Sequence, residues 1–287
     1  MSEKQSIKSS LVVIFLPSLL IVAGYFLWGY LQREVDGKKF TILSIVQTGP
    51  EKRALPTEYL AELMDLSVDK PQDLFTFDIA LAEEALLRSP LITSAKVKKM
   101  RPGIIYVDYE IRHPIAVLSD YENIGIDSKG YLFPLTPFFL SSSLPAFYLG
   151  IKKDAPFSWA EPLQTSHLKL AFLIFQTLDS KEFRKLFEIK NIDVSKAFHP
   201  SYGRREVVIR LEEEMKLGEA RCRFSEVLRL TPKEYEKELI HFLSLHEKMK
   251  TDYRIQLEKR KVSSDLIVFE PKVIDFRVAD LAFIKEG

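Results

Sequence analysis

The sequence predicts an α+β fold with an N-terminal transmembrane helix, a small mixed domain and a β-rich domain with helices on one side. Residues 11–31 contain no charged residue, which is typical of a membrane span. Residues 40–112 show strand, helix, helix, strand and strand patterns in turn. After Pro114, short strand-like segments alternate with turns, and the 46% of hydrophobic residues is enough for a core without disulfides.

The apolar N-terminal stretch favours a membrane helix over a cleaved signal peptide. A signal peptide has a shorter apolar region, of roughly 7–15 residues, and ends in small residues. This stretch is longer and closes with bulky aromatic residues such as Trp28, which suit a membrane interface. Basic residues lie on both sides, so charge alone does not fix the orientation. The expected boundaries are a tail at 1–10, a transmembrane helix at 11–31 and a linker at 32–39.

The small domain is expected to be a three-stranded sheet covered on one side by two helices. Its first strand ends at the Gly49–Pro50 breaker, and the turn Arg101–Gly103 joins its last two strands. The expected elements are a strand at 40–47, a helix from Thr57 as N-cap, a helix from Asp78, and strands at 93–100 and 104–112.

The last strand of this domain is expected to have one buried and one open face. Strict alternation turns Ile105, Val107, Tyr109 and Ile111 to the core. The opposite face either docks a partner chain or is simply solvated; its residues are Tyr106, Asp108, Glu110 and Arg112. A basic cluster nearby is either solvated or a contact for anionic lipid or wall polymer. Its residues are Lys96, Lys98, Lys99 and Arg101.

The remainder, residues 113–287, is expected to form the β-rich domain. An apolar helix is expected at 167–179, and a strand pattern at 205–230 is broken near Gly218. Thr231-Pro232-Lys233-Glu234 combines a cap, a first-turn proline and a capping-box glutamate, which predicts a helix start. Two extended segments, 265–270 and 272–284, end the chain.

The sequence contains few and incomplete motifs for catalysis or metal binding. The five histidines are scattered, and the single Cys222 excludes an intramolecular disulfide. Ser67-x-x-Lys70 and Ser166-x-x-Lys169 each match a penicillin-binding serine motif, but no K-T-G partner exists. With 41 basic and 40 acidic residues, the chain has no excess of positive charge of the kind that indicates nucleic-acid binding. We therefore expect no enzyme activity, cofactor, metal, nucleic acid or small-molecule substrate.

Several fragments, in order along the chain, resemble the FtsQ/DivIB bacterial cell-division family. The first strand of the family's POTRA domain is similar to FTILSIVQTG, and the following helix, strands and junction are similar to DLFTFDIALAEEALLRSPLITSAKVKKMRPGIIYVDYEIRHPIAVL. The family's β domain is similar to IGIDSKGYLFP, LPAFYLG and the terminal VIDFRV. The positions that match are Pro90, Val97, Arg101, Pro102, Arg112, Pro114 and Ala116. The sequence departs from the family at Ile111 and in the length of 251–270.

The resemblance implies a cytoplasmic tail, a POTRA domain at 40–112 and an extracytoplasmic β domain at 113–287, in the inner membrane at the division septum. It implies a non-catalytic scaffold that links cytoplasmic and periplasmic division proteins. The implied partners are the lipid bilayer and division proteins of FtsB/DivIC and FtsL type. Partner binding is expected by β-strand addition at the C-terminal strand. The residues expected there are Asp275, Phe276, Arg277, Val278, Leu281 and Phe283.

Two other functions stay open. The first is a membrane-tethered envelope enzyme, such as a cell-wall hydrolase or transferase, which buried paired carboxylates in a pocket would favour. The second is an envelope secretion or assembly component, which also uses POTRA modules. Such a component normally shows repeated modules followed by a long barrel, for which this chain is too short.

Overall fold

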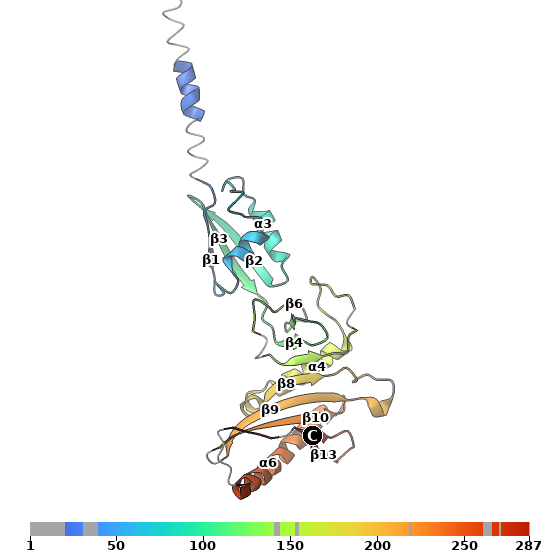
Figure 1. The fold of residues 1–287 in the computed structure, drawn as a ribbon. Helices are drawn as coiled ribbons and strands as arrows, with labels where there is room; N and C mark the ends of the chain where they lie inside the picture. The colour runs from blue at the N-terminus through green and yellow to red at the C-terminus, as the bar shows by residue number, and fades with distance from the viewer. Residues whose placement is uncertain are drawn as a thin grey trace, which may run out of the picture. The chain divides into compact units, whose positions relative to one another are not determined.

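Two compact units, Met1–Ile111 and Arg112–Gly287, make up the chain in a computed structural model (Figure 1). This division lies one residue from the predicted domain boundary. Each unit contains its own sheet and helices, so the class is α+β. The described residues are 21–30, 40–140, 144–152, 155–217, 220–260, 266–269 and 271–286.

The predicted transmembrane helix is corrected by the structure. Residues 21–30 are helical. Across the residues that the structure describes, no helix is both long and apolar enough to cross a membrane. The rest of the predicted span, the tail at 1–10 and the linker at 32–39 lie outside the described residues.

Unit 1 follows the predicted order of strand, helix, helix, strand and strand. Its elements are β1 (Ser44–Thr48), α2 (Thr57–Leu63), α3 (Ile79–Leu87), β2 (Ile92–Met100) and β3 (Ile104–Ile111). In its described residues the sheet order is β1-β3-β2, because β3 pairs parallel with β1 and antiparallel with β2. The central strand is therefore the last one in sequence (Figure 1).

Local sequence explains most of this unit. The predicted alternation of β3 is confirmed, since Ile105, Val107, Tyr109 and Ile111 are all buried. Helix α3 starts where expected, with the Asp78 carboxylate accepting the first free N–H groups of the helix. The expected Thr57 cap is wrong: Pro56 occupies the N-cap without a side-chain bond, and the Thr57 hydroxyl accepts a bond from the Gln47 amide instead.

Unit 2 is built on a mixed sheet of ten strands among the residues described. Its first strands are β4 (Ala116–Leu118), β5 (Ile124–Ile126), β6 (Leu132–Pro134), β7 (Ala146–Tyr148) and β8 (Glu188–Asp193). The long strands β9 (Val207–Leu217) and β10 (Ala220–Leu230) precede the short β11 (Leu266–Val268), β12 (Lys272–Asp275) and β13 (Phe283–Glu286). The order is β13-β12-β10-β9-β8-β7-β4-β5-β6, and β11 also pairs with β10.

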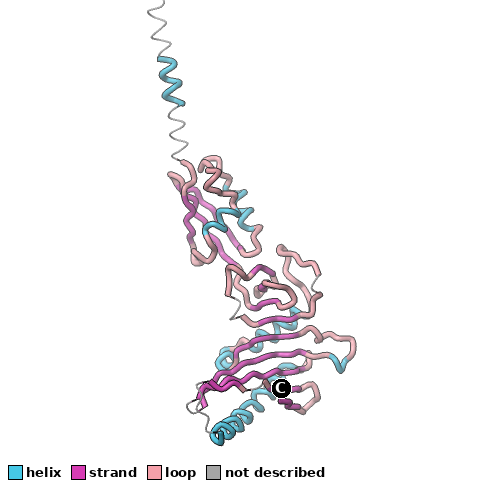
Figure 2. Tube along the Cα trace, in the orientation of Figure 1, coloured by secondary structure: helices cyan, strands magenta, loops and turns pink. Residues whose placement is uncertain are grey.

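The helices of unit 2 pack on one face of this sheet (Figure 2). They are α4 (Ser166–Leu178), α5 (Lys181–Leu186) and α6 (Tyr235–Arg260); the short η2 (Tyr202–Arg204) has no buried residue and lies in the loop before β9. Strand register places one row of side chains across that face, namely Phe147, Ile192, Ile209, Leu228, Ile274 and Ile284. All but the last are fully buried, and Ile284, at the sheet edge, is 47% exposed.

Helix α6 begins at the predicted start signal. The Thr231 hydroxyl accepts the N–H of Glu234, as an N-cap should. The carboxylate that returns to the Thr231 N–H and hydroxyl, at 2.7 and 2.8 Å, belongs to Glu238 instead of the predicted Glu234. The helix then continues to Arg260, so much of the unusually long segment 251–270 is helix.

Candidate protein-binding edge

The predicted terminal strand at 272–284 is two strands. β12 and β13 pair antiparallel, with Asp275 opposite Phe283, and a turn separates them. The chain turns because the Asp275 carboxylate accepts the N–H of Arg277 two residues later, which is an Asx turn. Asp280 then adopts a left-handed backbone with φ of 60°. Together β12, the turn and β13 form residues 272–286, which we call the C-terminal hairpin.

β13 is the last strand at one end of the sheet. It pairs with β12 on one side, and its other side has no strand partner among the residues described. An edge of this kind presents backbone N–H and C=O groups that an extended segment of another chain can pair with.

The hairpin also exposes apolar side chains around this edge. Among the predicted partner residues, Val278, Leu281 and Phe283 are each about half exposed. Phe276 is buried in the core of unit 2, so it is not accessible to a partner. Ile284, which the sequence did not single out, is exposed as well because no strand covers it.

A pocket of about 640 Å³ lies beside the hairpin. Val278 and Phe283 line it from the hairpin, and Phe198 and Tyr202 line it from the loop between β8 and β9. Its charged lining residues are Arg205, Lys233, Glu234, Asp275 and Arg277. A partially apolar pocket beside a free strand edge can hold a side chain of a strand that pairs with that edge.

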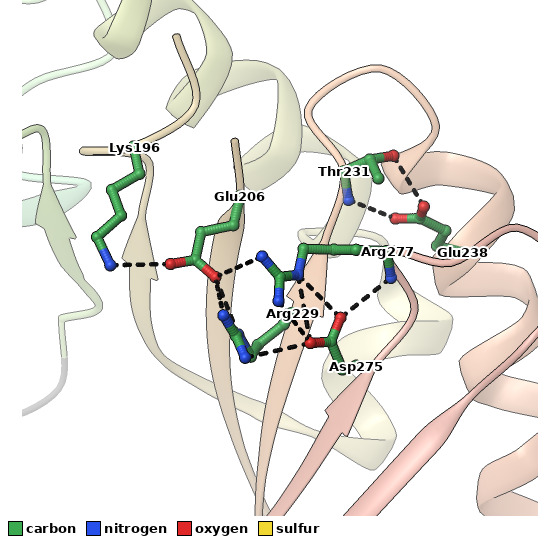
Figure 3. Close-up of polar contacts among 7 residues, drawn as sticks. All are labelled: Lys196, Glu206, Arg229, Thr231, Glu238, Asp275 and Arg277. Atoms are coloured by element: carbon green, nitrogen blue, oxygen red, sulfur yellow. Dashed lines mark hydrogen bonds and ion pairs between the residues drawn. The ribbon is translucent and has the colours of Figure 1, made fainter. Parts of the chain in front are cut away.

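Asp275 and Arg277 belong to an ion-pair network that ties the hairpin to β9 and β10 (Figure 3). Arg277 Nη2 lies 2.8 Å from Asp275 Oδ2, and Arg229 Nη1 lies 3.1 Å from the same oxygen. Both arginines also reach Glu206 Oε2, while Lys196 Nζ lies 2.9 Å from Glu206 Oε1. These two predicted partner residues therefore hold the hairpin in place.

The network keeps its carboxylates ionised. Burial raises the pKa of Glu206, but hydrogen bonds from Lys196 and Arg229 outweigh it and lower the pKa overall. Burial likewise raises the pKa of Asp275, and the bonds from Arg277 lower it by more. Because both groups stay charged at neutral pH, the ion pairs persist there.

The predicted surface on β3 is divided by the structure. Asp108 and Glu110 are exposed and Tyr106 is half-buried, all in unit 1. Arg112 belongs to unit 2, where it pairs with Asp127 at 2.9 Å and its guanidinium lies 3.9 Å from the centre of the Tyr131 ring. Three of the four residues thus lie in unit 1, and Arg112 lies in unit 2.

A buried charged cluster was missed at the sequence level. His246 Nε2 lies 2.7 Å from Glu213 and its Nδ1 lies 3.0 Å from Glu226, and Lys250 Nζ approaches Glu213 at 3.1 Å. Burial lowers the pKa of His246, but the bonds to Glu213 and Glu226 outweigh it and raise the pKa to about 9. Two features of the sequence point to this cluster. Glu213 and Glu226 fall at inward positions of their alternating strands, and His246 has helical spacing from the buried Phe242 on α6.

This cluster bears on the enzyme alternative. Glu213 and Glu226 are paired buried carboxylates, but His246 lies between them and Lys250 pairs with Glu213. These contacts anchor α6 to β9 and β10. Among the described residues, no group of three or more histidine, cysteine or acidic side chains has the arrangement to hold a metal ion.

No protein-family model matches this chain, and no curated protein matches it either. The similarity to the FtsQ/DivIB family thus stays a prediction from the sequence fragments.

Proposed function

We propose that this protein is a non-catalytic scaffold of a bacterial cell-division complex that binds partner proteins by β-strand addition at β13. The observation that carries the proposal is a terminal strand with one unpaired side among the described residues and exposed apolar side chains. The choice of cell division rests on the sequence resemblance, which also names FtsB/DivIC-type and FtsL-type proteins as the partners.

Two other sheet edges are less suited to strand addition. The β2 edge carries Lys96 and Lys98, and the N–H of Val97 already donates to the Glu83 carboxylate at 2.8 Å. β6 has three residues and ends at Pro134. Charged residues, side chains bonded to the backbone, proline and short length all protect an edge from pairing. These features favour β13, which exposes Phe283 and Ile284, over the β2 and β6 edges.

The parts of the site have separate roles in this proposal. The Glu206 network fixes the hairpin before binding, which reduces the entropy lost when a partner strand pairs with it. The backbone of β13 supplies sequence-independent hydrogen bonds. Val278, Phe283 and the pocket supply specificity, because covering the exposed half of each apolar side chain contributes up to roughly 1–1.5 kcal/mol.

A complementation experiment tests this function. Cells depleted of the native protein receive a fluorescent fusion of the whole chain, either unchanged or with Phe283→Glu. The charge at the edge and pocket is expected to abolish septal localisation and division. Leu173→Glu on α4 is the matched control, because Leu173 is 53% exposed against 56% for Phe283. Diffuse localisation of the unchanged protein with normal division contradicts the proposal.

A further inference from the structure

Three segments of unit 1, the first beginning at Phe40, are joined by backbone hydrogen bonds at one place on its surface. The N–H of Ile42 donates to Gln72 O at 2.9 Å and that of Leu74 donates to Phe40 O at 2.9 Å. The N–H of Leu43 donates to Gly103 O at 2.8 Å. These bonds join residues 40–43, 72–75 and 99–103 into one surface, which we call the unit 1 tip.

The tip exposes large apolar side chains from all three segments. Leu43 is 75% exposed, Phe75 is 57% exposed and Met100 is 50% exposed. Phe40 packs edge-on against Phe75, with ring centres 4.9 Å apart. Exposed apolar side chains gathered at one end of a domain favour an interaction there.

Two cations lie among these side chains. The Arg101 guanidinium lies 5.6 Å from the centre of the Phe40 ring and 5.3 Å from that of Phe75. Lys99 Nζ donates to the carbonyl of Phe75 at 3.3 Å. Asp73, the acid in these segments, uses its carboxylate to accept the N–H of Phe75 at 2.7 Å. The tip thus combines apolar side chains with positive charge.

We propose that the unit 1 tip contacts an anionic lipid surface, with Leu43, Phe75 and Met100 entering the headgroup boundary and Lys99 and Arg101 pairing with lipid phosphates. Basic residues beside exposed apolar residues suit this boundary, because cations near the surface are attracted to anionic lipid.

The chain that leads into the tip supports lipid as the occupant. Residues 21–30 are helical and expose apolar side chains, including Phe26 and Trp28, that need cover from water. The connection from Tyr30 to Phe40 spans at most about 35 Å even when fully extended. A lipid surface that covers one of these apolar regions is therefore within reach of the other.

The test places an environment-sensitive fluorophore on Leu43→Cys in the full-length chain. Cys222 is buried, so the native thiol is retained. The chain is prepared with vesicles of phosphatidylcholine alone or with added phosphatidylglycerol, and quenching by brominated lipid is measured. Leu87→Cys, on α3 and 48% exposed, is the matched control.

The expected result is stronger quenching at position 43 than at position 87, and only when phosphatidylglycerol is present. Arg101→Glu should lower the equilibrium constant for tip contact roughly tenfold. If that variant disturbs the tip, ionic strength gives a second measurement, because 1 M salt shortens the Debye length to ~3 Å and should weaken contact in the unchanged chain. Equal quenching at both positions, or no dependence on anionic lipid or salt, overturns the proposal.

Discussion

Removing the proton from His246 should weaken unit 2. The imidazolium lies between two buried carboxylates, and its pKa is raised from 6.5 to about 9. Such a rise corresponds to about 3 kcal/mol of stability contributed by the protonated form. Because the pKa is higher in the folded state, this contribution is complete below pH 6.5 and is lost as the pH rises through about 9.

At low pH, the stability of unit 2 changes with pH in the opposite direction. Burial raises the pKa of Glu213, but bonds from His246 and Lys250 outweigh it and lower the pKa below 4.5. The stability that this carboxylate contributes is present above pH 4.5 and declines as the pH falls through the lowered pKa. The cluster therefore contributes most between about pH 4.5 and 6.5.

Urea unfolding of the full chain, followed by circular dichroism at several pH values, measures this effect. The free energy of unfolding should fall between pH 6.5 and pH 9 and continue to fall just above it. His246→Gln should lower stability by about 3–5 kcal/mol, because it leaves buried carboxylates without their cation, and should remove most of the slope. His241→Gln, an exposed position on the same helix, is the control. A flat profile for the unchanged chain, or the same slope in His246→Gln, refutes the reasoning.

Two further substitutions test the residues that support the C-terminal hairpin and the unit 1 tip. Glu206→Gln should cost about 1–3 kcal/mol and speed hydrogen exchange of the β12 and β13 amides, whereas Glu214→Gln, at an exposed pair, should leave stability nearly unchanged. If hydrogen exchange of these amides stays slow in Glu206→Gln, the ion-pair network does not hold the hairpin in place. Gly103→Ala should lower the thermal stability of unit 1 by about 1–3 kcal/mol, because a Cβ there would lie 2.1 Å from the Thr41 carbonyl oxygen. Gly203→Ala, with open space around it, should be neutral.

Local patterns predicted the parts of the fold that depend on local physics. The alternation of β3 follows from its burial on one face, and the Asp78 and Thr231 signals start their helices because each side chain satisfies free N–H groups. The break after β12 was not predicted, because it depends on how the Asp275 carboxylate folds back onto the Arg277 N–H.

The candidate site was only partly predictable for a similar reason. Phe283 could be placed near the C-terminal edge, but sequence spacing does not show that Arg277 pairs with Glu206, about seventy residues earlier. The buried cluster of His246 likewise joins residues from two strands and a helix. Contacts of this range depend on strand register, which a single sequence does not specify.

The most direct test of partner binding at β13 is site-specific photocrosslinking in dividing cells. A photoreactive residue replaces Phe283 in the full chain, and Leu173 is replaced in a parallel control. The proposal predicts that position 283 crosslinks to an extended segment of a division protein, whereas position 173 does not. Normal division without any crosslink from position 283, or the same products from both positions, would contradict it.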